Sequence, residues 1–175
     1  MGSRYRYVGA VGQEDKNACW AACLSWWLKA TNKRRIEQWE IMDDDAYSDF
    51  WDVEGSSGTI SREGLLSIMK DPRWGMVHQV VERGSDLTSA VVEAHLNFGP
   101  IYVGYYDVVV GGNHVNIIYD ISGAAGYPQV KIMEPAGYRK RDGSYKGKHL
   151  ERGLTYYRAK EVILASPKDK LSLDR

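Results

Sequence analysis

Two residues near the start of the chain have the types and the spacing that amide-bond chemistry requires. Cys19 begins a strongly apolar run, and Gln13 lies six residues before it. In the first turn of a helix, unpaired backbone N–H groups and the positive end of the helix dipole favour a thiolate over a thiol. A glutamine that folds back beside the sulfur can donate an N–H to an oxyanion. We therefore expect Cys19 to be the nucleophile and Gln13 to be an oxyanion donor.

The second cysteine, Cys23, has a different setting. It lies one turn further along the same predicted helix, whose small and apolar residues indicate burial on most sides. Two cysteines four residues apart on one helix are poorly placed for a disulfide. We expect Cys23 to be a buried core thiol, with Asn17 or Asp15 as the helix N-cap and the helix end near Thr31.

His114 is the best candidate for a catalytic base among the four histidines. It begins an apolar strand directly after a Gly-Gly turn, so its ring can project from a strand end into a cleft. The other three, His78, His95 and His149, lie in a predicted strand, on a helix and in a basic loop. None of them pairs with another ligand at metal-binding spacing, and we expect neither a metal nor a cofactor.

These residues resemble the papain-like cysteine proteases. In that family a glutamine stands six residues before a nucleophile that opens the central helix and is followed by an aromatic residue, here Trp20. The run Cys-Trp-Ala-Ala-Cys is similar to the compact bacterial members, such as the staphopain-like and plant-pathogen effector proteases. The 95 residues from Cys19 to His114 also fit this branch, and the segment that begins at Asn113 is similar to the family's histidine strand. The resemblance implies that Trp20 and Asn113 bind substrate.

A third residue in this family orients the histidine by accepting a hydrogen bond from its other ring nitrogen. The family has Asn or Asp at the end of the strand that pairs with the histidine strand, and Glu134 occupies that place, before Pro135. Glutamate is one methylene longer than aspartate, so Asp120 and Asn116 stay open as the orienting group. A carboxylate at a hairpin edge with no catalytic role is the remaining alternative. We favour Glu134.

The elements that must position these residues change their periodicity half-way along the chain. The first half predicts a strand or extended arm over residues 4–11, one or two short helices over 36–51, a loop at 55–58 and a helix over 62–70 that Ser61 caps. The second half predicts a strand over 76–82, a helix from Asp86 to 97, strands over 101–110, 114–121 and 129–134, a polar loop over 137–153, and one bent strand or two short strands over 154–165.

This order of elements predicts an α+β fold with two lobes and a cleft between them. The resemblance implies that this fold is of the papain type. We expect a single domain over residues 1–175, with a helical lobe at about 12–98, a sheet lobe at about 99–165 and a frayed tail at 168–175. The length of 175 residues and the hydrophobic content of 43% suit one domain with its own core.

The charge of the chain excludes several classes of partner. Its 23 basic and 23 acidic residues leave no electrostatic footprint for nucleic acid or for an anionic membrane. The N-terminus lacks an apolar signal segment, and no stretch is long enough to span a bilayer. We expect a protein that stays in the cytoplasm of the producing cell or is delivered into a target cell by a specialised secretion system.

The residues and the resemblance together predict a cysteine peptidase that cleaves proteins or peptides, as a bacterial effector or toxin domain. A cognate inhibitor or immunity protein is a further candidate partner. Two other classes stay open: an amide hydrolase such as a deamidase or peptidoglycan amidase, and a catalytically silent binding module. The strand that begins at His114 is also similar to that of the cell-wall NlpC/P60 hydrolases, but their Asp-Cys-Ser-Gly motif is absent.

Overall fold

A six-stranded antiparallel sheet lies at the centre of the computed structural model, which describes residues 4–31, 34–51, 59–109, 111–124, 126–158 and 160–171. Its spatial order is β1-β6-β2-β3-β4-β5. The strands are β1 Met76–Val81, β2 Ile101–Asp107, β3 Gly112–Ser122, β4 Gln129–Arg139, β5 Tyr145–Gly153 and β6 Val162–Pro167. The strand that begins with the predicted base is therefore a central one, paired on both sides.

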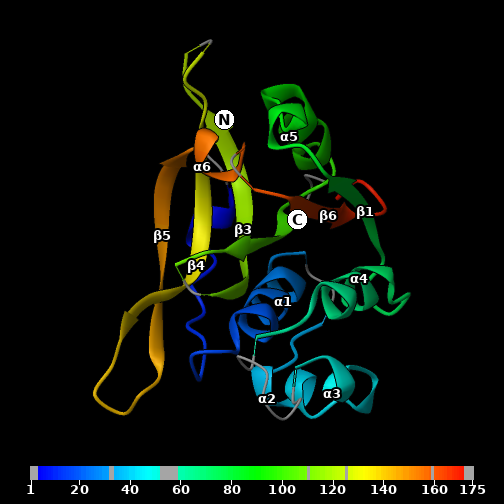
Figure 1. Cartoon of the computed structure of the whole chain (residues 1–175), viewed down its shortest axis with the longest axis vertical. Helices are drawn as coiled ribbons and strands as arrows, with labels where there is room; N and C mark the ends of the chain where they lie inside the picture. The colour runs from blue at the N-terminus through cyan, green and yellow to red at the C-terminus, as the bar shows by residue number, and fades with distance from the viewer. Residues whose placement is uncertain are drawn as a thin grey trace.

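Helices pack on both faces of this sheet. They are α1 Cys19–Ala30, α2 Gln38–Met42, α3 Asp45–Trp51, α4 Arg62–Lys70, α5 Ser89–Leu96 and α6 Thr155–Arg158, with 3₁₀ turns at Arg4–Tyr7 and Gly84–Asp86. Figure 1 shows α1 to α4 gathered in the lower part of the view and α5 and α6 above them. Two apolar cores result. One lies between the sheet and helices α1 and α4, and the other lies between the sheet and helices α5 and α6. The predicted α+β class is confirmed.

The central helix α1 is almost entirely inside the protein. Every residue of α1 except Lys29 is buried, as its apolar sequence predicted. The Trp27 indole N–H donates to the carbonyl of Pro100 at 2.8 Å, and the Tyr102 hydroxyl donates to the carbonyl of Trp20 at 3.1 Å. Large aromatic side chains that bury most of their surface dominate core energetics. These contacts fix the start of α1 against β2 and its later part against the residue that precedes β2.

The predicted N-caps of α1 are wrong. The N-cap position is Ala18, and no side chain caps it. The Asp15 carboxylate instead accepts from the backbone N–H of Asn17 at 2.6 Å, which makes a local turn before the helix. The Asp15 carboxylate therefore pairs with a backbone N–H of the loop that leads into the helix. The first N–H groups of α1 have no side-chain cap.

Several elements of the second half also differ from expectation. The predicted polar loop at 137–153 is largely strand, because β4 runs on to Arg139 and pairs with β5. An edge strand tolerates exposed basic residues, and this polarity looked like a loop in the sequence. The segment after β5 forms the short helix α6 before β6 and does not continue as strand. Thr88, which accepts from the Val91 N–H, caps α5 in place of Asp86.

The ends of the chain pack against the rest more than predicted. The segment at 4–11 begins with a 3₁₀ turn, where we expected a strand or an extended arm. The backbone N–H of Lys168 donates to Gly75, and that of Leu171 donates to Phe98, so residues 168–171 are held and not frayed. Strand β1 lies in the range expected for the helical lobe, yet it pairs with β6 at one edge of the sheet. The loop predicted at 55–58 and residues 172–175 lie outside the described residues.

Among the described helices, none has the length and apolar character needed to cross a membrane.

Candidate active site

Cys19 and His114 come together from two elements that are far apart in sequence. Cys19 is the first residue of α1 and His114 lies near the start of β3; they are 2% and 7% exposed. The two side chains interact, and the Cys19 sulfur favours the protonated form of the His114 ring. One turn further along the helix, the Cys23 thiol donates to the carbonyl of Val115 at 3.3 Å, which holds α1 against β3 beside the pair. The structure therefore brings the predicted nucleophile and base into contact.

Glu134 contacts the other side of the His114 ring. The Nε2 atom of His114 lies 2.7 Å from Oε1 of Glu134, which leaves Nδ1 for Cys19. The Ala136 N–H donates to the same carboxylate oxygen at 3.2 Å. Glu134 stands at the end of the regular β3–β4 and β4–β5 pairing, just before Pro135, so its side chain faces the start of β3.

The two alternative orienting groups are engaged elsewhere. The Asp120 carboxylate accepts from the Lys131 ammonium at 2.9 Å. The Asn116 side chain is buried, donates to the Tyr105 hydroxyl at 3.1 Å and accepts from the Tyr157 hydroxyl at 2.9 Å. Of the three candidates, Glu134 is the one that contacts the imidazole.

The environment favours the charged forms of the His114–Glu134 pair. Burial acts against the imidazolium, but hydrogen bonds and charges from Cys19 and Glu134 outweigh it and raise the pKa of His114 to about 10. Burial likewise favours the neutral acid of Glu134, yet its contacts with His114, Arg152 and the Ala136 N–H lower its pKa below the ordinary value. A protonated imidazole between a thiol and a carboxylate stabilises a thiolate.

Gln13 is held by its backbone between two strands. Its N–H donates to the carbonyl of Pro135 at 3.2 Å, and its carbonyl accepts from the Tyr145 N–H at 2.9 Å. The buried side-chain amide donates to the Asp15 carbonyl at 2.7 Å. One of its two N–H bonds is therefore used to orient the amide, and the second remains for another acceptor.

Trp20 and Asn113, the predicted substrate-binding residues, have structural contacts. The Trp20 indole is fully buried and packs edge-on against Tyr47, with ring centroids 6.1 Å apart. The Asn113 amide donates to the carbonyl of Ile60 at 2.8 Å, which ties the start of β3 to the segment before α4. Their roles in substrate binding stay predictions.

Arg152 is a site residue that the sequence did not reveal. Its Nη2 atom lies 3.2 Å from Oε2 of Glu134. We had placed Arg152 in a polar loop, whereas it lies near the end of β5, next to β4. The sequence could have indicated Arg152 only through its place on a strand next to the one that carries Glu134. That inference requires β5 to be predicted as a strand.

A shallow hollow of about 250 Å³ opens beside this cluster. Its lining residues are Asp107, His114, Glu134, Ala136, Lys148, Leu150, Arg152 and Tyr156. The wall is thus formed by β2, β3, β4, β5 and α6. The hollow gives solvent access to the carboxylate side of the His114 ring.

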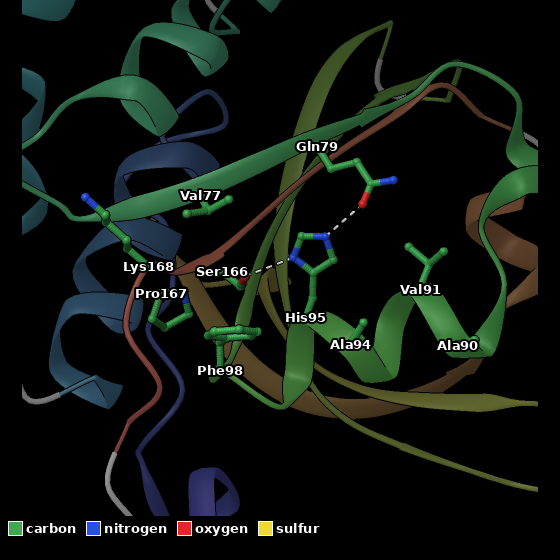
Figure 2. A pocket seen from close by; sticks show the side chains of 10 residues that line it. All are labelled: Val77, Gln79, Ala90, Val91, Ala94, His95, Phe98, Ser166, Pro167 and Lys168. Atoms are coloured by element: carbon green, nitrogen blue, oxygen red, sulfur yellow. Dashed lines mark hydrogen bonds between the residues drawn. The ribbon is translucent and has the colours of Figure 1, made fainter.

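A larger cavity, of about 460 Å³, lies between β1, the end of β6 and α5. Figure 2 shows His95 in it, with one ring nitrogen 2.9 Å from the Ser166 hydroxyl and the other 3.1 Å from the Gln79 side-chain oxygen. Both nitrogens of His95 are therefore engaged with neutral groups, and burial lowers its pKa. The lining contains no thiol, so we place the candidate active site at Cys19 and His114.

The geometry agrees with a comparison against protein families. Residues 5–148 match the family described as papain-like cysteine protease AvrRpt2. The chain belongs to this family. Membership in the AvrRpt2 family supports a peptidase role and confirms the resemblance seen in the sequence. The match includes Gln13, Cys19, His114 and Glu134, and it ends before Arg152.

Solved structures add information on the fold alone. Four chains are similar to this one. The crystal structure of Ly7917 matches with a TM-score of 0.53 and 14% sequence identity, over 94% of this chain. This chain spans 59% of the Ly7917 chain. No curated protein matches.

Proposed function

We propose that this chain is a cysteine peptidase in which Cys19, His114 and Glu134 form the catalytic triad. The observation that carries the proposal is the ring of His114, which bonds the carboxylate of Glu134 through Nε2 and interacts with Cys19 on its other side. This is the arrangement that activates a cysteine nucleophile: a base takes the thiol proton, and a carboxylate fixes the tautomer of the base. Membership in the AvrRpt2 family supports it.

The reaction follows from these contacts. The Cys19 thiolate attacks the carbonyl carbon of the scissile bond, and the carbonyl electrons move to the oxygen. His114 then gives its Nδ1 proton to the leaving amine as the tetrahedral intermediate collapses to a thioester. A water molecule, deprotonated by His114, attacks the thioester and releases the acid. Glu134 stabilises the imidazolium in both halves and stays an ionised carboxylate throughout.

Gln13 and the backbone N–H of Cys19 supply the oxyanion hole in this proposal. The first N–H groups of a helix lack partners within the helix, so that of Cys19 is free to donate to the oxyanion. The second N–H of the Gln13 amide is the other donor, since the Asp15 carbonyl fixes the first. Trp20 and Asn113 complete the site as substrate-binding residues.

The substrate class in this proposal is protein or peptide, and the setting is that of a bacterial effector or toxin domain delivered into a target cell. The resemblance to the compact bacterial proteases supports this setting. A cognate inhibitor or immunity protein would bind the same cleft.

Two experiments test the proposal in sequence. A thiol-directed peptide electrophile should add once, at Cys19, as judged by intact and peptide mass. If no adduct forms, the proposed triad is wrong and a catalytically silent binding module is the better interpretation. Incubation with casein and, separately, with purified peptidoglycan should then release peptides from casein only. Hydrolysis of peptidoglycan alone would replace the peptidase with an amidase.

A further inference from the structure

Arg152 binds the oxygen of Glu134 that His114 does not use. Oε1 of Glu134 faces the His114 ring and the Ala136 N–H, whereas Oε2 lies 3.2 Å from Nη2 of Arg152. The Glu134 side chain is 9% exposed and that of Arg152 is 20% exposed. Such a partly buried, charge-assisted hydrogen bond is stronger and better defined than a surface ion pair.

The guanidinium of Arg152 is itself held in place. It lies over the ring of Tyr156, 4.3 Å from the centroid, and the Tyr156 hydroxyl donates to Asp107 at 2.8 Å. The Lys160 ammonium lies on the same ring at 4.9 Å and 3.9 Å from the Asp107 carboxylate. Helix α6 and the end of β2 therefore support Arg152, and Arg152 supports Glu134.

A glutamate in this position needs such support. The glutamate side chain has one more rotatable bond than that of aspartate. Its carboxylate can therefore adopt more orientations that do not contact the imidazole. His114 and Ala136 contact Oε1 of Glu134, and Arg152 contacts Oε2. The carboxylate can keep all three contacts in one orientation. We propose that Arg152 is a positioning residue that acts through Glu134, fixing the carboxylate so that Oε1 accepts from His114. This inference rests on the proposed function, because it gives Glu134 its orienting role.

Positioning and simple charge predict effects of opposite sign on the His114 ring. As a positioning group, Arg152 holds the carboxylate against Nε2 and thereby stabilises the imidazolium and the Cys19 thiolate. As a bare positive charge nearby, it destabilises the imidazolium. A bare positive charge also stabilises the thiolate directly, so loss of the guanidinium raises the pH of thiolate formation in both cases. Only in the first case does the size of that shift depend on the Glu134 carboxylate.

Other titratable groups face the cluster from every neighbouring element. They are Cys19 on α1, Tyr105 and Asp107 on β2, Lys148 on β5, and Tyr156 and Tyr157 on α6. Burial raises the pKa of Tyr105, Tyr156 and Tyr157, so these hydroxyls stay neutral near pH 6. The Asp107 carboxylate accepts from Tyr156 and lies 3.9 Å from the Lys160 ammonium, and both partners are kept in every variant. Differences between the variants in the acid range therefore come from the cluster of Cys19, His114 and Glu134.

The experiment measures the rate of Cys19 alkylation by iodoacetamide against pH, by mass, and needs no substrate. Four proteins are compared: wild type, R152Q, E134Q and the double variant. We expect R152Q to react about 10-fold more slowly at pH 6, with its acid limb moved to higher pH. In the E134Q background the same change should add less than about two-fold, because the group through which Arg152 acts is gone.

Controls separate this inference from structural damage and from the proposed function. R139Q, an exposed arginine on β4, should match wild type. Thermal unfolding checks that each variant is folded. If R152Q does not fold, R152K replaces it in the comparison, because lysine keeps the positive charge but lacks the planar guanidinium. An acid limb at lower pH, or equal slowing in both backgrounds, overturns the positioning role. A wild-type rate in E134Q instead overturns the triad itself.

Discussion

At the scale of single residues, the imidazole of His114 has to serve a thiol on one side and a carboxylate on the other. The sequence alone predicted Cys19 and His114 as a pair, because each has a position that its chemistry needs, a helix start and a strand start, and the structure brings them together. Glu134 followed from the family resemblance. Arg152 could not be found this way, because its role depends on a contact between neighbouring strands and β5 had no apolar alternation to reveal it.

Alanine at either member of the pair should abolish turnover. We expect Cys19→Ala and His114→Ala each to lower casein hydrolysis by about 1,000-fold or more while the domain stays folded, because each removes a group that makes or breaks bonds. The matched control is Cys23→Ala. It loses the buried sulfur with its packing and its hydrogen bond to Val115, so it should cost about 1–2 kcal/mol of stability and little activity. Near wild-type hydrolysis by either alanine variant would show that the pair is misassigned.

The carboxylate of Glu134 should matter through both its charge and its reach. Glu134→Gln keeps the shape but favours the wrong imidazole tautomer, so we expect the rate to fall by orders of magnitude, toward the roughly 10⁴-fold cost of a neutralised triad carboxylate. Glu134→Asp keeps the charge and loses only reach, and it should retain partial activity. Asp120→Asn is the control, since Asp120 pairs with Lys131. A larger loss in Asp120→Asn than in Glu134→Gln would reverse our assignment.

At the scale of elements, the active site depends on segments that meet backbone to backbone. Predictions succeeded where the pattern was strong: the buried helix α1, the helix capped by Ser61 and the apolar strand β3. They failed where tertiary contacts decide the structure. Edge strand β5 is polar because one side faces solvent, and the N-terminal arm takes its path from β5.

The arm that carries Gln13 lies so close to β5 that only glycine fits at two places. A Cβ on Gly12 would overlap the carbonyl oxygen of Tyr145, and one on Gly147 would overlap that of Val11. We expect Gly12→Ala to displace the Gln13 backbone from Tyr145, costing about 1–3 kcal/mol of stability and lowering kcat. Urea unfolding and casein hydrolysis measure both.

Gly9 offers a matched control on the same arm. A Cβ there meets no atom within 4 Å, so Gly9→Ala should leave stability and activity close to wild type. Equal activity in Gly12→Ala and Gly9→Ala would mean that the arm does not position Gln13 for catalysis.

At the scale of the whole molecule, the site links protein stability to pH. Glu134 has a pKa below its ordinary 4.5 because its contacts with His114 and Arg152 outweigh burial. A carboxyl group whose pKa is lower in the folded than in the unfolded state stabilises the fold above its unfolded pKa. That contribution is lost as the pH falls through the folded value.

The stability difference between wild type and Glu134→Gln should therefore depend on pH. We expect wild type to have the higher Tm at pH 6. The gap should narrow as the pH falls from about 4.5 through the lower pKa of the folded state, below which the carboxylate is neutral in both states. Thermal unfolding by circular dichroism across this range measures the gap. A gap that stays constant or widens in acid would mean that the Glu134 charge does not stabilise the fold.

The central claim is that Cys19 is an activated nucleophile, and its reactivity relative to Cys23 tests this most directly. Both thiols are buried, so exposure alone does not separate them. Cys19 interacts with the His114 ring, whereas burial raises the pKa of Cys23 well above its ordinary value. Iodoacetamide at neutral pH, followed by peptide mass mapping, should therefore label Cys19 quickly and Cys23 only after unfolding. The reaction at Cys19 should slow in His114→Ala. Equal labelling of the two cysteines, or no labelling of Cys19 in the folded protein, would contradict the assignment.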